Sequence, residues 1–190
     1  MKKITLMLTL VFSVFINAQT FNGTGGAIPD NSCGTAHEFP VTVSGVGVLG
    51  AANVLDNIAL DITHTWDTDL DIYIIAPDGT SVELSTDNGG SGDNYTGTIF
   101  SASATTLITS GTAPFTGVYK PEGDLSTLMG IDADGIWILR VCDDAVGDTG
   151  TLNSWSISFT VAPTCVEPNL LAASNITPYS VQLDWNDPSG

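Results

Sequence analysis

The sequence predicts an all-β protein, built as a jelly-roll-like β-sandwich and followed by a truncated second β domain. Three observations support this fold class. Apolar and polar residues alternate in many short segments, as they do in strands that bury one face. Gly, Asp and Asn separate these segments, as is typical of turns between strands. No long stretch has the helical period of about 3.6 residues, and only "GDLSTLMGI" is expected to form a single helical turn.

The chain begins with the features of a secretory signal peptide, residues 1–19. "MKK" is a short basic segment, "ITLMLTLVFSVFI" is apolar, and "NAQ" closes the segment with small or polar residues. We therefore expect cleavage near Gln19 and a secreted or cell-surface protein. The apolar run is shorter than the roughly 20 residues of a membrane helix, and no later run is as long, so no membrane span is expected in the mature chain.

A lead-in rich in Gly and Asn, residues 20–38, is expected to be flexible. The main domain then covers residues 39–161, which is enough chain for one core. In one of its strands, Leu70, Ile72 and Ile74 share the face expected to point inward. The expected strands lie in segments 38–50, 54–66, 70–77, 80–86, 135–142 and 154–161.

The composition changes at residues 162–168, "APTCVEP", where two prolines indicate a linker. Residues 169–190 hold a short strand, a turn and a second strand in which Val181, Leu183 and Trp185 alternate. Two strands cannot bury enough apolar surface to fold alone. We therefore expect that the sequence is a fragment of a longer protein.

The mature chain is strongly acidic. The full sequence has 21 acidic and four basic residues and a formal net charge of −17. Loss of Lys2 and Lys3 with the signal peptide brings the charge to about −19 and leaves only Lys120 and Arg140. Nucleic acids and anionic membranes are bound through Lys and Arg, so neither is an expected partner. The charge favours a soluble extracellular protein that attracts cations.

The three cysteines, Cys33, Cys142 and Cys165, make a disulfide plausible in an exported protein. Cys33–Cys142 is the favoured pair, because it ties an early segment to a late strand, as sandwich topologies permit. Cys142–Cys165 is the alternative, and either choice leaves one cysteine over. No CxxC motif or Cys/His cluster indicates zinc.

Two segments resemble the P domain (P/Homo B domain) of proprotein convertases. They are "ITHTWDTDLDIYIIAPDGTSVELS" and "GIWILRVCDDAVGDTGTLNSWSISF". The family has a His-containing strand, then "DLxIxLxSPxGTxxxL", then "GxWxLxVxD…GxLxxWxLxF". Ala76 departs from this pattern, since Ser is usual there. The matching residues are His64, Asp69, Leu70, Ile72, Ile74, Pro77, Gly79, Thr80, Leu84, Gly135, Trp137, Leu139, Val141, Asp143, Gly150, Leu152, Trp155, Ile157 and Phe159.

The resemblance implies a non-catalytic, galactose-binding-like sandwich that accompanies and stabilises a subtilisin-like protease domain. In the family that protease domain comes first, whereas here only the signal peptide and lead-in precede the matching segments. The terminal piece resembles the start of a fibronectin type III domain, with Trp185 as its core tryptophan. Together these parts resemble a secreted multi-domain protein of the Bacteroidetes type, whose other domains would be partners of this one.

Catalysis has little support in the sequence. His37 and His64 are the only histidines, and neither has a GxSxG or subtilisin-like serine motif to act on. His64 lies in a strand of the family pattern, so we interpret it as structural. Acids are so frequent that a glycosidase-like pair would occur by chance. No catalytic residue is therefore assigned.

Calcium is the one cofactor that the acids favour. Asp67, Asp69 and Asp71 recur at every second position, so an extended strand would present them on one side. An EF-hand is excluded, because Ile72 and Asp78 stand where Gly and Glu are needed. The alternative for these acids is a solvated face or a turn. Other ligand sources are the loops with Asp87, Asn88, Asp93 and Asn94 and with Asp143, Asp144 and Asp148.

The aromatic residues divide into two groups. Trp137, Trp155 and Phe159 fit an alternating core, whereas Trp66 and Tyr95 lie near expected loops and are candidates for exposed contacts. Three hypotheses follow: a non-catalytic module for folding, adhesion or presentation; an accessory domain of a secreted subtilisin/kexin-like serine endopeptidase; or a calcium-dependent binder of an extracellular protein or glycan.

Overall fold

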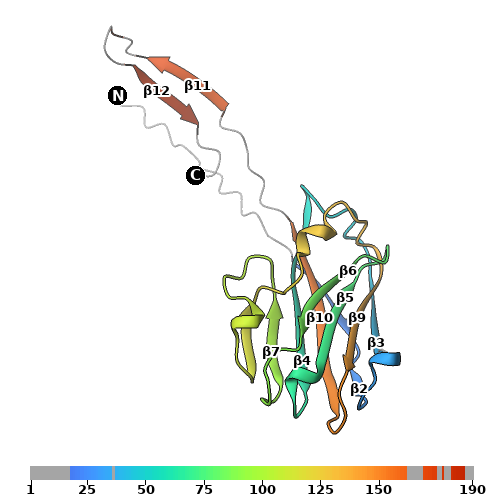
Figure 1. Ribbon diagram of the computed structural model, residues 1–190. Coiled ribbons are helices and arrows are strands. Elements are labelled where there is room, and N and C mark those ends of the chain that lie inside the picture. Colours follow the sequence, from blue (N-terminus) through green and yellow to red (C-terminus); the bar gives the residue numbers. More distant parts are fainter. Residues whose placement is uncertain (1–17, 36, 162–168, 175–176, 178–180, 187–190) are drawn as a thin grey trace, which may run out of the picture.

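The computed structural model describes residues 18–35, 37–161, 169–174, 177 and 181–186. Most of the expected signal peptide and the whole linker at 162–168 lie outside these residues. The described part is all-β, with helical residues only in short 3-10 turns, which confirms the predicted fold class (Figure 1). Over these residues no helix is long and apolar enough to cross a membrane.

The larger sheet has six strands in the order β1-β10-β4-β7-β8, with β2 also paired to β10. The pairs are antiparallel except for β7–β8, which is parallel. A cis Ala113–Pro114 bond precedes β8. The strands are β1 (Gln19–Gly23), β2 (Gly26–Ile28), β4 (Asn53–Thr63), β7 (Tyr95–Phe100), β8 (Phe115–Tyr119) and β10 (Gly150–Val161).

The smaller sheet has four antiparallel strands in the order β3-β9-β5-β6. Its central strands β9 and β5 are rich in Ile, Leu and Val, as expected for strands paired on both sides. The strands are β3 (His37–Val43), β5 (Leu70–Ile75), β6 (Ser81–Thr86) and β9 (Gly135–Asp143).

The core lies between the two sheets. Leu70, Ile72 and Ile74 of β5 are fully buried, which confirms the predicted inward face. Trp137 of β9 packs against Phe159 of β10, with ring centroids 5.7 Å apart, so aromatic rings from opposite sheets meet. The alternation read from the sequence thus sorts side chains correctly between core and surface.

The turn "APDGT" joins β5 to β6 as the sequence predicts. The N–H of Ala76 donates to the carbonyl of Thr80 (2.8 Å), and the N–H of Gly79 donates to the carbonyl of Ala76 (2.9 Å). Gly79 has φ +91°, a conformation that only glycine adopts freely. The side chain of Asp78 accepts from the N–H of Thr80 at 2.9 Å, which closes the turn.

The expectation that residues 20–38 are a flexible lead-in is wrong. β1 and β2 pair with β10, and a 3-10 turn, Cys33–Thr35, follows them. His37 begins β3 and lies opposite Val141. β1 and β2 were not predicted because their Gly- and Asn-rich sequences lack an alternation of apolar and polar residues. These two strands are instead ordered by pairing to the long strand β10.

The C-terminal residues form a separate strand pair. β11 (Asn169–Ser174) and β12 (Gln182–Asn186) are antiparallel, with Ser174 opposite Gln182. The residues between them that would complete a fibronectin-type pattern are partly outside the described set. The likeness to a fibronectin type III domain therefore stays a prediction.

Candidate functional site

A buried His64–Asp143 pair lies at one end of the sandwich. His64 directly follows β4, and Asp143 ends β9. The ring Nε2 lies 3.1 Å from the carboxylate Oδ2, and both side chains are fully buried. The pair therefore joins the larger sheet to the smaller one through a hydrogen bond that solvent does not reach.

Both ring nitrogens of His64 are engaged. Nδ1 lies 3.0 Å from the carbonyl oxygen of Trp66 and 3.2 Å from its backbone nitrogen. It accepts from the N–H of Trp66 when it carries no proton and donates to the carbonyl when it does. The backbone N–H of His64 donates to Oδ1 of Asn94 at 3.0 Å. His64 thus fixes the chain that leaves β4.

Asp143 is also held from several sides. Its Oδ1 accepts from the N–H of Ala145 at 3.0 Å. Its carbonyl accepts from the N–H of Ser32 at 2.6 Å, and its N–H donates to the Ser32 hydroxyl at 3.3 Å. A residue of the supposedly flexible lead-in therefore closes the buried pair.

Gly150 makes the approach of β10 to this pair feasible. A Cβ at Gly150 would lie 2.5 Å from Cδ2 of His64 and 2.7 Å from the carbonyl oxygen of Thr63. Neither position can yield easily, since one is a buried ring and the other is backbone. Sequence reasoning placed Gly150 in the family pattern without identifying this role.

Asp67 lies beneath the loop at residues 87–94. Its Oδ1 accepts from the N–H of Asn94 at 2.8 Å, and its own N–H donates to the carbonyl of Gly92 at 2.9 Å. A Cβ at Gly89 would lie 2.8 Å from Cβ of Asp67, so the loop can pass this closely only with glycine there. Asp67 therefore anchors the loop by its backbone and its side chain.

The second carboxylate oxygen of Asp67 has no hydrogen-bond partner although it is buried. Burial raises the pKa of Asp67 to about 7, against the opposing effects of the Asn94 hydrogen bond and of His64. A buried carboxylate with one unpaired oxygen is costly when it is charged. Protonation, a water molecule or a cation would each relieve it.

The predicted single face of Asp67, Asp69 and Asp71 is wrong. Asp67–Asp69 form a 3-10 turn and the strand begins only at Leu70, so the two-residue spacing does not align the three carboxylates. Asp67 and Asp69 are buried rather than solvated, and Asp71 is half-buried. The alternation of the acids did not predict this turn. Because of the turn, the side chains of Asp67 and Asp69 do not continue the face of the strand.

Asp69 and Asp71 have different neighbours. The pKa of Asp69 is raised by burial and then by the nearby Asp143 and Asp148. The pKa of Asp71 is raised to about 6 by burial and then by Asp144. Burial and neighbouring acids both disfavour ionisation of these carboxyls, and His64 opposes this effect at Asp69.

Cys33 and Cys142 form a disulfide beside Asp71. The sulfurs are 2.09 Å apart and the Cα atoms 4.9 Å apart. This is the pairing that the sequence favoured, and Cys165 lies outside the described residues. Over the described chain, Cys33, Asp71 and Cys142 are the one set of three metal-ligand side chains that converge, but oxidised sulfurs are not thiolate ligands.

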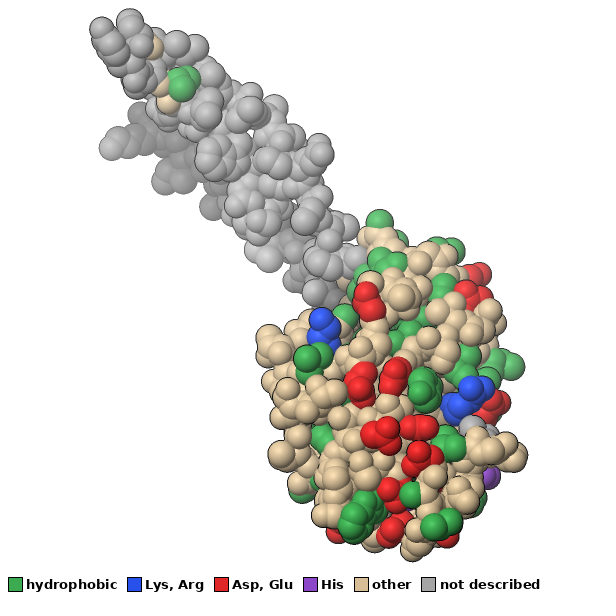
Figure 2. Space-filling view, viewed as in Figure 1, with side chains coloured by type: hydrophobic (Ala, Val, Ile, Leu, Met, Phe, Trp, Pro, Cys, Tyr) green, Lys and Arg blue, Asp and Glu red, His purple; other side chains and the backbone are tan. Residues whose placement is uncertain are grey.

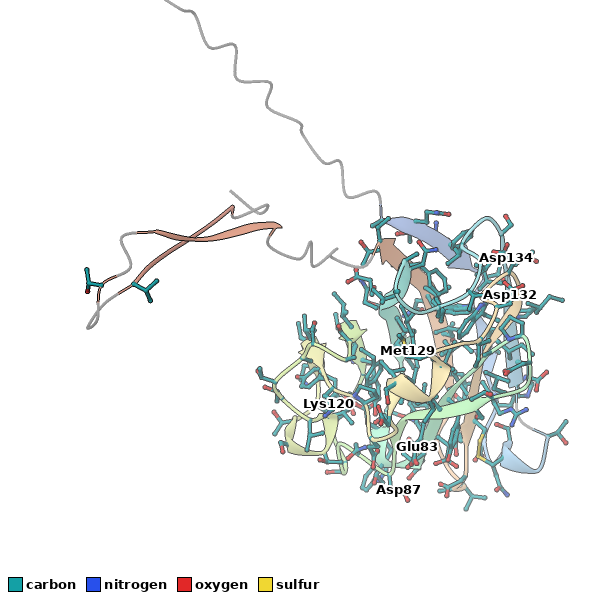
Figure 3. All side chains as sticks on the ribbon, turned by 90° about the horizontal axis from the view of Figure 1, so that it is seen from above. Glu83, Asp87, Lys120, Met129, Asp132 and Asp134 are labelled. Atoms are coloured by element: carbon teal, nitrogen blue, oxygen red, sulfur yellow. A yellow bond between two sulfur atoms is a disulfide. The ribbon has the colours of Figure 1, made fainter. Side chains whose placement is uncertain are left out.

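The remaining acids predicted as ligands are spread over the surface and loops. Figure 2 shows acidic side chains gathered on one face of the domain. Glu83, Asp87, Glu122 and Asp144 are close enough to Asp71 to raise its pKa, and Glu83 and Asp87 lie on the same side in Figure 3. Oδ1 of Asp148 accepts from the hydroxyl of Thr65. These groups form an acidic strip rather than a shared ligand shell.

The two aromatic residues predicted to make exposed contacts, Trp66 and Tyr95, differ in solvent exposure. Trp66 is 43% exposed, as expected. Tyr95 is fully buried, so its prediction as an exposed contact is wrong: its ring stacks on Phe115 at 4.7 Å and its hydroxyl bonds to Ser85 at 2.9 Å. Tyr95 begins β7 with its ring inward, which the adjacent loop obscured.

Comparison with known proteins identifies a matching protein family and several similar proteins. The family described as "Proprotein convertase P-domain" matches residues 57–159, more than half of the chain. Leupeptin-inactivating enzyme 1 of Streptomyces exfoliatus is 33% identical over 141 residues, which are 74% of this chain and 26% of that protein. Transglutaminase-activating metalloprotease of Streptomyces mobaraensis is 27% identical over 150 residues, 74% of this chain and 16% of the relative.

Among solved structures, the complex of the Aeromonas sobria serine protease with a chaperone aligns with a TM-score of 0.48 and 18% identity, over 78% of this chain and 27% of that one. The chain thus spans about a quarter or less of each of these proteins. The range that matches the family contains His64, Asp67, Asp143 and Gly150, which build the buried end of the sandwich. The chain belongs to the proprotein convertase P-domain family.

Proposed function

We propose that this chain is a non-catalytic P-domain module of a secreted or cell-surface multi-domain protein, serving folding and stability, adhesion or presentation. The observation that carries the proposal is the closed environment of His64. Its ring nitrogens are bonded to Asp143 and Trp66, and no Ser, Thr or Cys side chain of the described chain is bonded to it. A general base needs a nucleophile within hydrogen-bond reach, so this pair is suited to structure rather than to catalysis.

A peptidase assay tests this proposal. The purified chain should release no product from fluorescent casein or peptide substrates above a matched blank. Turnover that persists through further purification and is lost in Asp143→Ala would overturn it.

The second candidate is an accessory module of a secreted subtilisin/kexin-like serine endopeptidase. It is supported by membership of the proprotein convertase P-domain family, and one of the similar proteins, the transglutaminase-activating metalloprotease, shows a likeness to proteases of another class as well. Reading the coding sequence beyond Gly190 separates the two candidates. A subtilisin-like Asp/His/Ser domain there would support the accessory role and count against a protein without protease activity.

Secretion is part of the proposal. The basic and apolar start of the chain and the Cys33–Cys142 disulfide both support an oxidising, exported location. Sequencing the N-terminus of the exported protein tests it: a start near Gln19 is expected, and an intact Met1 in the exported material would contradict it.

Calcium binding also stays a proposal, and Asp67 is the position that favours it most. Its unpartnered oxygen lies below the loop that contains Asp93 and Asn94, two oxygen-bearing side chains. A ligand that binds only the folded chain must raise its melting temperature. Melts in millimolar calcium and in chelator should therefore differ, and the difference should vanish in Asp67→Asn. Equal melting temperatures for the parent chain would count against calcium.

A further inference from the structure

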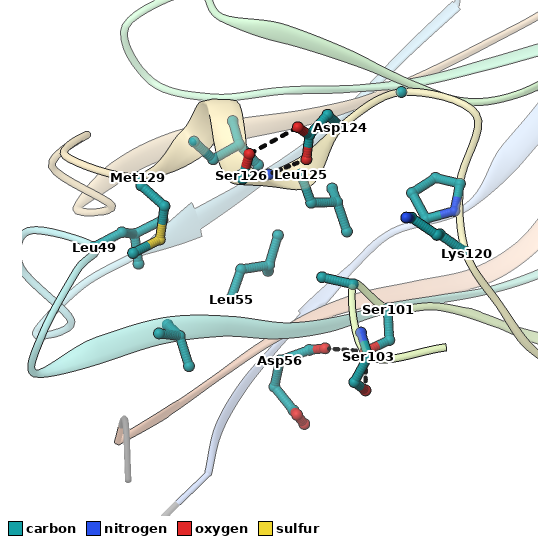
Figure 4. Close-up of a pocket in the computed structure, with 15 residues that line it drawn as sticks. Leu49, Leu55, Asp56, Ser101, Ser103, Lys120, Asp124, Leu125, Ser126 and Met129 are labelled. Carbon is teal, nitrogen blue, oxygen red and sulfur yellow. Dashed lines mark hydrogen bonds between the residues drawn. The ribbon is translucent and has the colours of Figure 1, made fainter. Parts of the chain in front are cut away.

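An apolar pocket of about 490 Å³ opens at the end of the sandwich away from His64 (Figure 4). Leu55, near the start of β4, lies in the pocket, whereas His64 follows the other end of that strand. The volume falls within the range of roughly 300–1,000 Å³ that is typical of binding pockets. The apolar lining includes Leu49, Leu55, Leu125, Leu128 and Met129.

Exposed apolar side chains adjoin the mouth of this pocket. Met129 belongs to the lining and is 50% exposed, and Val48, 58% exposed, precedes another lining residue. Val161 is 48% exposed and ends β10 beside the start of β4, where the chain leaves the larger sheet. A ligand confined to the pocket would leave these side chains in water. Apolar side chains grouped around an apolar hollow therefore favour a protein segment as the occupant.

Carboxylates outnumber cations around the opening. Asp124 lines the pocket, and a hydrogen bond from a backbone N–H of the adjacent 3-10 turn holds the pKa of Asp124 below its usual range. Asp56 lines the pocket from β4, and Asp132 lies opposite the exposed Val48. Lys120 is the one basic residue of the lining, and it lies close enough to Asp124 to stabilise the charge of that carboxylate. The mouth of the pocket is therefore acidic on balance.

We propose that the pocket binds a basic, apolar segment of a partner protein, with a leucine-like side chain in the pocket and Lys or Arg at its acidic rim. The formal net charge of −17 attracts such a segment to the domain. Among the described residues only Lys120 and Arg140 are basic, and Arg140 is paired with Glu38 at 2.8 Å. A second copy of the described chain therefore offers no basic segment and would be repelled.

The apolar and the charged parts of this surface have different roles. Burial of the apolar side chain should supply most of the affinity, because exposed charge pairs are weakened by water and salt. The carboxylates should decide which apolar segments bind, because an acidic rim repels acidic partners. The two contributions can be separated by changing one at a time.

Fluorescence anisotropy with three labelled peptides makes this separation. One peptide has two leucines flanked by lysines, the second replaces the leucines by serines, and the third replaces the lysines by glutamates. The serine peptide should bind roughly tenfold more weakly than the leucine–lysine peptide, and the glutamate peptide at least roughly fivefold more weakly. Failure of the leucine–lysine peptide to bind, equal binding of all three, or a preference for the glutamate peptide would overturn the proposal.

A pair of tryptophan variants locates the binding site. Ala102 lines the pocket and is exposed, so Ala102→Trp should fill the pocket while the chain still folds. Val146→Trp is the control, since Val146 is 75% exposed and lies in the loop before β10, at the opposite end. Ala102→Trp should weaken binding of the leucine–lysine peptide roughly tenfold, and Val146→Trp should leave it unchanged. Unchanged binding in Ala102→Trp, or an equal loss in both variants, would contradict binding at the pocket.

A pair of double variants tests the acidic rim. Asp56→Asn/Asp124→Asn removes two charges at the pocket, and Asn still serves as the cap of the 3-10 turn. Asp78→Asn/Asp144→Asn removes two exposed charges elsewhere. The first change should weaken binding of the leucine–lysine peptide roughly threefold or more, and the second by less. Equal losses would show that overall charge alone attracts the peptide and would overturn the proposal.

These titrations are separate from the tests of the proposed function. They require neither calcium nor a protease domain beyond Gly190. A negative result would therefore remove the basic partner and leave the peptidase assay and the calcium melts unaffected.

Discussion

The two ends of the sandwich are built on opposite principles. The histidine end, with His64, Asp67, Asp143 and the loop at 87–94, buries polar groups and pairs most of them. The exit end, with the pocket around Leu55 and Met129, exposes apolar groups and leaves them open. One end is closed by internal hydrogen bonds, and the other is suited to be closed by something outside the core.

This difference separates stability from interaction within one small domain. Buried polar groups are costly when a partner is lost, so changes at the histidine end should act on folding. Exposed apolar groups contribute little to the isolated domain, so changes at the exit end should act on contacts with other segments.

The disulfide beside Asp71 should contribute most to the free energy of unfolding. Cys33 and Cys142 are separated by 109 residues, and closing so long a loop restricts the unfolded chain strongly. Cys33→Ala/Cys142→Ala should lower the free energy of unfolding by about 4 kcal/mol. Urea unfolding measures it, and Cys165→Ala is the control; equal stability of the double variant and the control would refute the expectation.

Replacement of Asp143 by Ala should cause the second-largest loss of unfolding free energy. It leaves His64 buried without its partner, which should cost about 3 kcal/mol of unfolding free energy. The adjacent Asp144 is exposed, so Asp144→Ala should change stability by less than about 0.5 kcal/mol. Similar losses in the two variants, measured by urea unfolding, would show that the histidine end is not closed by this pair.

Asp67 should make stability depend on pH. Its pKa of about 7 in the folded chain exceeds its value of 3.8 when unfolded, so the folded state holds the proton more tightly. The resulting stabilisation is complete below about pH 4 and is lost as the pH rises to about 7. Relative to Asp67→Asn, the parent chain should therefore lose stability progressively as the pH rises across this range.

Chelator should be present in these melts, so that no cation contributes. His64, Asp93 and Tyr95 also face Asp67 and are retained in both proteins. Asp56→Asn, a change to an exposed acid, is the control and should follow the parent at every pH. A pH-independent difference between parent and Asp67→Asn would contradict a raised pKa.

The smallest effect is expected at the exit end. Val48→Ser removes an exposed methyl pair, so the unfolding free energy should change by less than about 0.5 kcal/mol. Thermal unfolding measures it. A loss as large as that of Asp143→Ala would show that the exit end also carries the stability of the domain and would remove the contrast.

The sequence predicted the sandwich well because its strands sort apolar residues by period two. Leu70, Ile72 and Ile74 point inward as expected, and "APDGT" turns where Gly79 permits it. It failed for β1 and β2, because edge strands rich in Gly and Asn are ordered by the partner strand and not by their own pattern.

The candidate site was harder to predict, because its geometry depends on a turn and on distant contacts. A local period of two placed Asp67, Asp69 and Asp71 on one face, but the 3-10 turn before Leu70 separates them. Asp143 was predicted as part of the family pattern and as an alternative calcium ligand, and its pairing with His64, 79 positions earlier, requires the fold to be known. Ser32 and Gly150 likewise act through close approach, which composition does not reveal.

We propose that the His64–Asp143 pair holds the fold and performs no chemistry. The most direct test treats the purified chain with a fluorophosphonate probe and with peptide substrates, and follows mass and cleavage together. We expect no added mass and no cleavage, while Asp143→Ala loses stability. Labelling of a Ser, or cleavage, that disappears in Asp143→Ala at a temperature where that variant is still folded would contradict it.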